Sequence, residues 1–183
     1  LPAPIIFGSF LLTIILFVVT YNNLTNELDK NIETNFKVFE KMFNDQVESK
    51  TKDVSIAMEL IVSDNSILSK FANGDREGIT NMLIDVYESK LKKTYDIDQL
   101  QFHTPPATSF LRLHQPNQFG DDLSSFRETV VLANKERKIV SGIEIGRGGP
   151  GLRIVYPANY DSQHLGTIEF GLGLGNILTS INH

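Results

Sequence analysis

Side chains that could bind or polarise a ligand gather in one short part of the sequence. Between Phe102 and Arg127 the chain holds two histidines, two arginines and four phenylalanines. Apolar and polar residues alternate from Ser109 to His114, a pattern that predicts a β-strand with successive side chains on opposite faces. One face is then expected to be apolar, and the other to carry a guanidinium and an imidazole. The two sets are Ser109, Leu111 and Leu113, and Phe110, Arg112 and His114.

Further arginines are expected near the same polar face. Arg127 falls in the first turn of a predicted helix, where the helix dipole disfavours a cation, so a neighbouring anion or carboxylate is expected. Arg147 and Arg153 flank a glycine-rich turn. A guanidinium fork fits a carboxylate, and this grouping therefore predicts a pocket for a small anionic, carboxylate-bearing molecule. The predicted ligand-binding residues are His103, Phe110, Arg112, His114, Arg127 and Arg153.

The arginines also have a purely structural interpretation. Buried cations need partners, and carboxylates of the protein itself could supply them. The acidic residues that could do so are Asp121, Asp122, Glu128, Glu144 and Glu169. For any single arginine this interpretation stays open, and the grouping of several is what favours a ligand.

Other chemistries find little support in the sequence. The segment from Gly146 to Gly151 matches G-x-G-x-x-G by letter, but a dinucleotide turn needs a helix N-terminus after it. Here a strand is predicted to follow and Pro150 lies inside the segment, so we expect a β-hairpin connection and no cofactor. The histidines lack H-x-x-x-H or H-E-x-x-H spacing, and no G-x-S-x-G turn occurs. We therefore expect no metal, no catalytic residue and no enzyme.

The composition limits the partners. The chain of 183 residues carries a formal net charge of −5 and has no cysteine. Disulfides and thiolate metal sites are thereby excluded. A nucleic-acid-binding surface needs a basic stripe, so we expect no nucleic acid partner.

The first part of the chain is apolar on every side. No charged residue occurs from Leu1 to Asn26, and the run from Ala3 to Tyr21 is almost wholly apolar. Such a helix spans about 28 Å, close to the hydrocarbon thickness of a bilayer. We expect residues 1–22 to cross a membrane. A cleaved signal peptide, which needs a basic start, and a buried core helix, which is apolar mainly on one face, are the alternatives.

A second helical pattern follows the apolar run. Apolar residues recur at steps of three and four, and neither glycine nor proline occurs from Leu28 to Ile61. The spacing predicts one long amphipathic helix over residues 23–62. Its stripe needs a partner, and we expect a homodimer through the same helix of a second chain; the alternative is that the chain's own domain covers it. The stripe consists of Leu24, Leu28, Ile32, Phe36, Phe39, Phe43, Val47, Val54, Met58 and Ile61.

Residues 63–183 change from helical to strand patterns near Thr94. Before it, Asp64 and Asp75 lie at the starts of two short predicted helices. After it, five strands and one helix from Asp122 or Ser124 to Glu136 are predicted, and the short links among the last three strands require antiparallel pairing. The fold class is α+β, a five-stranded antiparallel sheet packed against helices. The strands are predicted at 99–103, 109–114, 138–145, 152–156 and 165–171.

Three stretches of this sequence resemble a known family. They are FHTPPATSFLRLHQPNQFGDDLSSFRETV, GIEIGRGGPGLRIVYP and GTIEFGL, and they are similar to Cache-type extracytoplasmic sensor domains of bacterial chemoreceptors and sensor kinases. The resemblance covers about residues 24–175. It implies a long helix leaving a first membrane span, a PAS-like sheet with a ligand pocket over residues 63–183, and a second span leading to signalling modules. It also implies that the span lies in a bacterial inner membrane, with the chain after about residue 23 in the periplasm or outside the cell. The chain reaches His183 without that second span.

The resemblance implies a function as well as a fold. It implies the ligand-sensing domain of a transmembrane chemoreceptor, which relays a conformational change across the membrane. The sensor domain of a histidine kinase or diguanylate cyclase is one alternative, and a membrane-anchored structural module without a ligand is another. The length fits a single PAS-like lobe, with the first lobe of a two-lobe protein as the other possibility.

Overall fold

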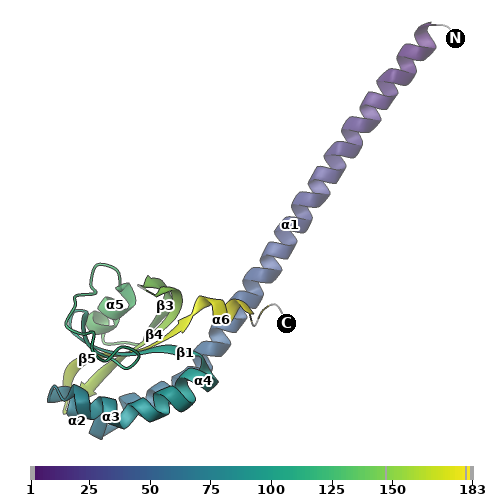
Figure 1. Ribbon diagram of the computed structural model, residues 1–183. Helices are drawn as coiled ribbons and strands as arrows, with labels where there is room; N and C mark the ends of the chain where they lie inside the picture. The colour runs from purple at the N-terminus through teal and green to yellow at the C-terminus, as the bar shows by residue number, and fades with distance from the viewer. Residues whose placement is uncertain (1–2, 147, 180, 182–183) are drawn as a thin grey trace. The chain divides into compact units, whose positions relative to one another are not determined.

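The computed structural model describes residues 3–146, 148–179 and 181, with side chains from residue 12 onward in those ranges. The chain divides into two units, Leu1–Asn44 and Asp45–His183. Helix α1 (Ala3–Val62) provides all of the first unit that is described and the beginning of the second (Figure 1). The long helix predicted from the apolar spacing is thus confirmed.

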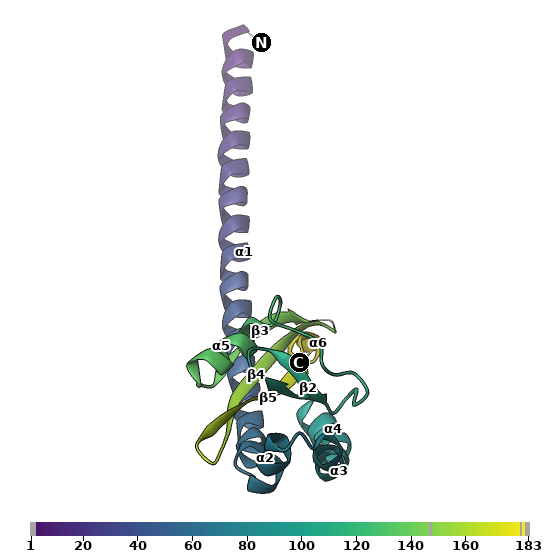
Figure 2. The same ribbon diagram turned by 90° about the vertical axis from the view of Figure 1, so that its left-hand side faces the viewer.

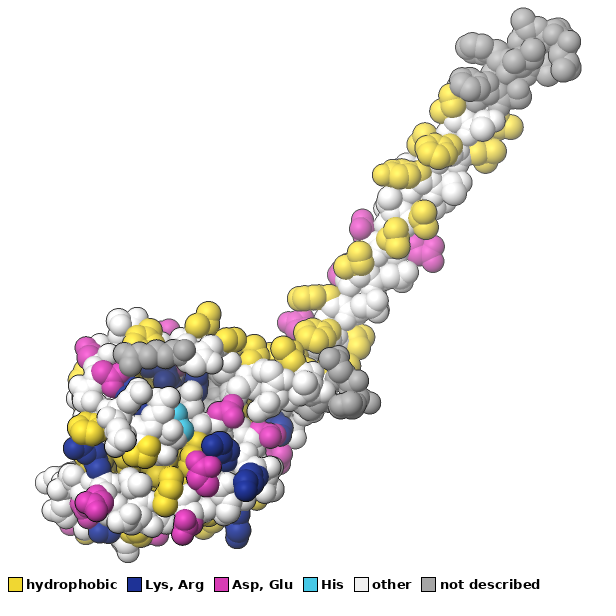
Figure 3. All heavy atoms as spheres, in the orientation of Figure 1, with side chains coloured by type: hydrophobic (Ala, Val, Ile, Leu, Met, Phe, Trp, Pro, Cys, Tyr) yellow, Lys and Arg dark blue, Asp and Glu magenta, His cyan; other side chains and the backbone are white. Residues whose placement is uncertain are grey.

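The first unit is a single helix with exposed apolar side chains. Leu28, Ile32 and Phe36 are each more than half exposed, and Figure 3 shows apolar side chains along this stretch of α1. Within the described residues, no helix combines the length and the apolar character that crossing a membrane requires. The predicted span over residues 1–22 includes side chains outside the description, and it stays a prediction.

Two short helices follow α1 in the second unit, and each begins at the aspartate expected from the sequence. The Asp64 carboxylate accepts hydrogen bonds from the backbone N–H groups of Ser66 and Ile67 at the start of α2 (Asn65–Ala72). Asp75 accepts one from Gly78 in α3 (Arg76–Val86). A π-helical turn η1 (Tyr87–Leu91) and α4 (Lys92–Tyr95) then lead to the sheet.

The sheet has five strands in the order β2-β1-β5-β4-β3, with every neighbouring pair antiparallel (Figure 2). This confirms the predicted α+β class. The first and last strands in sequence, β1 and β5, are paired with each other, so the last strand lies between β1 and β4 inside the sheet. The strands are β1 (Ile97–Thr104), β2 (Thr108–Arg112), β3 (Val140–Gly146), β4 (Gly149–Tyr160) and β5 (Gln163–Gly173), and β5 continues into α6 (Leu174–Thr179).

Helices cover both faces of the sheet (Figures 1 and 2). On one face lie the end of α1, with Val54 and Met58 fully buried, and α2, whose Phe71 ring meets the Phe102 ring edge-on at 5.4 Å. On the other face lies α5 (Glu128–Glu136), and an apolar cluster fills the space beneath it. Its members are Ala107, Leu123, Val130, Ala133 and Val155. Each large apolar side chain buried here contributes about 1.5–3 kcal/mol of transfer free energy.

Several predicted boundaries were wrong: the second strand ends at Arg112 rather than at His114, the fourth runs from Gly149 to Tyr160, and two further differences bear on the site. The turn expected from Gly146 to Gly151 is much shorter, because Gly146 pairs with Gly149 and Pro150 pairs with Ile145 inside the strands. Proline is tolerated there because β4 pairs with β5 only from Gly151 onward, so its missing N–H breaks no bond on that side. Helix α5 starts at Glu128 rather than at Asp122 or Ser124, since turns occupy the residues between.

Candidate functional site

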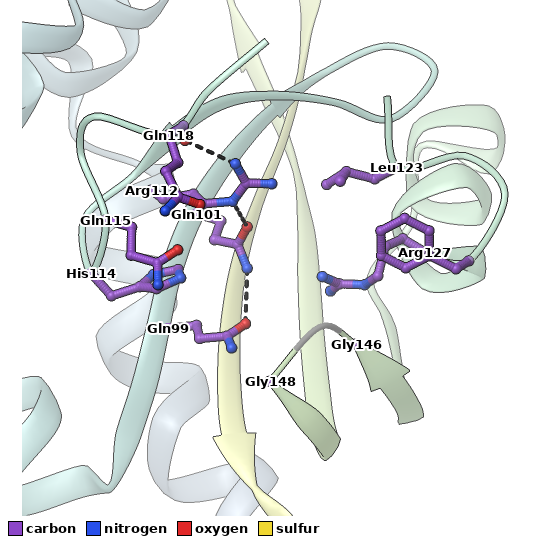
Figure 4. Close-up of a pocket in the computed structure, with 11 residues that line it drawn as sticks. Gln99, Gln101, Arg112, His114, Gln115, Gln118, Leu123, Arg127, Gly146 and Gly148 are labelled. Atoms are coloured by element: carbon purple, nitrogen blue, oxygen red, sulfur yellow. Dashed lines mark hydrogen bonds between the residues drawn. The ribbon is translucent and has the colours of Figure 1, made fainter. Parts of the chain in front are cut away.

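A polar cavity of about 260 Å³ opens on the α5 face of the sheet (Figure 4). Its walls come from β1, the end of β2 and the loop after it, the start of α5, and the β3–β4 hairpin. This volume equals that of roughly nine water molecules in the liquid, which suits a small organic molecule. The lining residues are Gln99, Gln101, Arg112, His114, Gln115, Gln118, Leu123, Phe126, Arg127, Gly146 and Gly148.

A β-bulge decides which side chains of β2 reach the cavity. Leu111 pairs with Phe102, but Ser109 pairs with His103, so Phe110 is an extra residue without a partner on β1. The predicted alternation of faces is broken there. Arg112 reaches the cavity as expected, whereas Phe110 lies on the opposite face, 4.8 Å from the Phe71 ring in α2. Phe110 does not line the cavity, because the bulge reverses its direction.

Arg112 is held by the protein on all sides. Its two terminal nitrogens donate to both carboxylate oxygens of Asp121, at 2.7 and 2.9 Å, and one also donates to the Gln118 carbonyl. Its Nε donates to Gln101 Oε1 at 3.3 Å. The structural interpretation therefore applies to Arg112, although its guanidinium also forms part of the cavity wall.

Arg127 joins three elements at the cavity. It precedes the first residue of α5, its Nε donates to Glu144 of β3 at 3.1 Å, and its Nη2 donates to Glu169 of β5. A carboxylate was expected beside this arginine, and two are present, those of Glu144 and Glu169. Burial would lower the pKa of Arg127, but Glu169 and Glu144 outweigh it and raise that pKa, so the guanidinium is firmly charged.

Glu169 is the buried centre of the charge network. Its side chain is fully inaccessible to solvent and lies within 4 Å of Arg127, of Arg153 and of His103. Burial alone would raise the pKa of Glu169, yet Arg127, His103 and Arg153 together outweigh burial and lower it. Among the described residues, three arginines thus face three carboxylates at the site. They are Arg112, Arg127 and Arg153, and Asp121, Glu144 and Glu169.

The two histidines predicted for the site are neutral at pH 7. Burial is the largest cause for both and lowers the pKa of His103 and of His114 to about 4, with the positive charge of Arg112 acting in the same direction. His114 lines the cavity, whereas His103 lies beneath it, with its Nδ1 3.3 Å from Thr167 Oγ1.

Of the six predicted residues, the structure brings Arg112, His114 and Arg127 to the cavity wall. Arg153 and His103 belong to the buried layer that supports it, and Arg147 lies outside the described residues. Sequence reasoning missed Gln99 and Gln101, which point from β1 into the cavity. Alternate polar residues along the first predicted strand were the available signal.

A long helix, an antiparallel sheet of order 2-1-5-4-3 and a polar cavity on the sheet face away from that helix define a sensor domain of the Cache class. Residues 26–183 match the family described as the double sensory domain of two-component sensor kinases, and the chain belongs to this family. It is a family of sensory rather than catalytic domains. The predicted resemblance is thereby confirmed.

Solved structures agree on the fold. The sensor domain of E. coli DcuS superimposes with a TM-score of 0.61 at 15% identity, covering 75% of this chain and 98% of that one. The extracellular domain of a histidine kinase superimposes with a TM-score of 0.58 at 14% identity, covering 76% of this chain and 56% of that one. The sensor domain of the V. cholerae histidine kinase DctB superimposes with a TM-score of 0.52 at 13% identity, covering 79% of this chain and 61% of that one. The chain thus spans little more than half of the last two domains. Among curated protein sequences, none matches the chain.

Proposed function

We propose that this chain is the extracytoplasmic ligand-sensing part of a bacterial transmembrane receptor, and that it binds a small anionic molecule in the cavity beneath α5. The observation that carries this proposal is the polar cavity itself, closed by two arginines and several amide side chains on one face of a sensor-type sheet. The family description favours a two-component sensor kinase as the output over the chemoreceptor expected from the sequence.

The charge network offers a route for the signal. Arg127 at the cavity wall is bonded to Glu169 in β5, and β5 continues directly into α6. A ligand that draws on Arg127 would shift β5 relative to β3, which Glu144 connects to the same guanidinium. The ligand needs only to prefer one arrangement, since about 1.4 kcal/mol of preference changes the equilibrium tenfold.

A thermal-shift panel tests the proposal on the 183-residue chain. Small organic acids, amines and amino acids are each added at millimolar concentration, and the melting temperature is recorded. We expect at least one acid to raise it, because a ligand at 100 times its dissociation constant adds about 2.7 kcal/mol of stability. A structural module without a ligand would show the same melting temperature with every compound, and that result would refute the proposal.

We also propose that the receptor is a homodimer through the exposed stripe of α1. Phe36 is 65% exposed, and the rings of Phe39 and Phe43 stack at 6.4 Å on the same helix. Replacing Phe36 and Phe43 by glutamate is expected to abolish cross-linking between neighbouring long helices in membranes, because like charges would meet in the interface. Thr34→Glu, on the opposite side of the helix, is the matched control and should cross-link normally. Unchanged cross-linking of the double variant would show that the stripe is not the interface.

A further inference from the structure

The hydrogen bonds beneath the cavity fix the orientation of two glutamine side chains. A guanidinium can only donate, so Gln101 must turn its oxygen to Arg112 Nε, at 3.3 Å. Its amide nitrogen then donates to Gln99 Oε1 at 3.0 Å, and the same oxygen accepts from Arg153 Nη1 at 2.7 Å. Figure 4 shows Gln99 and Gln101 side by side on β1. The NH₂ group of Gln99, which can only donate, therefore stands at the end of this series of hydrogen bonds.

A second donor faces it across the cavity. The guanidinium of Arg127 projects from the start of α5 toward β1 (Figure 4). Its Nε and Nη2 are taken by Glu144 and Glu169, and its Nη1 has no hydrogen-bond partner among the described residues. The Nε2 of Gln99 likewise has none among them. These two donors thus belong to residues that line the same cavity from opposite walls.

The other two arginines are already bonded to groups of the protein itself. Every nitrogen of Arg112 already donates, to Asp121, to Gln118 or to Gln101. Arg153 is buried and bonded to Gln99. Among the described residues, three cations are already balanced by three carboxylates. A first ligand carboxylate can use the donors of Gln99 and Arg127, whereas a second would add a further negative charge that no remaining cation of this set offsets.

We propose that the cavity binds the single carboxylate of a small, otherwise uncharged molecule between the Gln99 amide and Arg127. This inference rests on the proposed function and narrows its ligand class. The remaining wall suits a neutral body, because Leu123 and Phe126 are apolar and Gln115 and Gln118 are uncharged. The volume of about 260 Å³ limits that body to a short chain or a single ring.

Titration calorimetry on the 183-residue chain tests the ligand class directly. The probes are acetate, propionate, butyrate and benzoate, with succinate as the dicarboxylate, propionamide as the uncharged analogue and propylamine as the cation. We expect saturable binding of at least one monocarboxylate, and at least tenfold weaker binding of succinate, propionamide and propylamine. Equal or tighter binding of any of these three would overturn the inference while leaving the proposed sensing function intact. Failure of all seven probes would also overturn it, and the broader thermal-shift panel would then decide the function separately.

A charge-changing variant tests the position. Gln99→Glu keeps an oxygen for Arg153 and Gln101 but replaces the donor by an anionic oxygen. We expect the best monocarboxylate to bind about tenfold to hundredfold more weakly. Gln163→Glu, the same change at an exposed position of β5, is the control and should bind within twofold of the wild type. Unchanged binding by a folded Gln99→Glu would refute the position, and the comparison of probes on the wild-type chain does not depend on whether this variant folds.

Discussion

Replacing Glu169 by glutamine is expected to lower the free energy of unfolding by about 3–5 kcal/mol, the cost of breaking a buried ion pair. The carboxylate is fully buried between Arg127 and Arg153, and its negative charge offsets the cost of burying two guanidinium groups. Glutamine has nearly the same volume, so the loss would come from electrostatics rather than from packing. Urea denaturation of the 183-residue chain at pH 7, followed by tyrosine fluorescence, measures it.

The matched control is Glu136→Gln, at the exposed end of α5. Surface substitutions of this kind change stability by about 0.5 kcal/mol or less. If Glu169→Gln cost no more than the control, the three arginines would have to be balanced in another way, and the charge network described for the cavity would be wrong.

Much of the fold could be predicted because it depends on local patterns. The apolar spacing of α1, the caps at Asp64 and Asp75, and the antiparallel arrangement of the last three strands all follow from residues close together in the sequence. Periodicity and capping are local properties, and the sequence displays them directly. The same reasoning could not place Phe110, because a bulge depends on how β2 meets its partner strand.

The site was harder to predict because its partners are distant in the sequence. Arg127 finds Glu144 seventeen positions away and Glu169 forty-two positions away, on two different strands. Sequence reasoning named these carboxylates as candidates but had no means of choosing among five. The role of Gln99 became visible only when the bonds to Arg153 and Gln101 fixed its amide. Electrostatic partners are set by topology, which the local pattern does not contain.

Acidification from pH 7 to pH 5 is expected to destabilise the protein, and His103 is expected to account for about 2 kcal/mol of the loss. Its pKa in the folded state is lowered from 6.5 to about 4, chiefly by burial, with Arg127 and Arg112 opposing protonation and Glu169 and Asp121 favouring it. At a pH between these two pKa values, the imidazole is protonated in the unfolded chain and neutral in the folded chain. Stability therefore rises with pH through this window and falls on acidification.

The variant His103→Asn isolates this contribution, because asparagine does not titrate and its amide can take the place of Nδ1 beside Thr167. Urea denaturation at pH 7 and pH 5 should show a difference between the two pH values that is about 2 kcal/mol smaller than in the wild type. Burial would raise the pKa of Glu169, but Arg127, His103 and Arg153 lower it, so in the wild type this carboxylate titrates on the acid side of its ordinary value. His114 adds a loss of the same sign in both proteins, and it cancels in the comparison. His164→Asn, at a more accessible position near the β4–β5 hairpin, is the control and should leave most of the pH dependence in place. If His103→Asn kept the full pH dependence, the His103 imidazole would have to be protonated in the folded wild type, paired with Glu169 at 3.8 Å. The conclusion that this histidine is neutral would then be wrong.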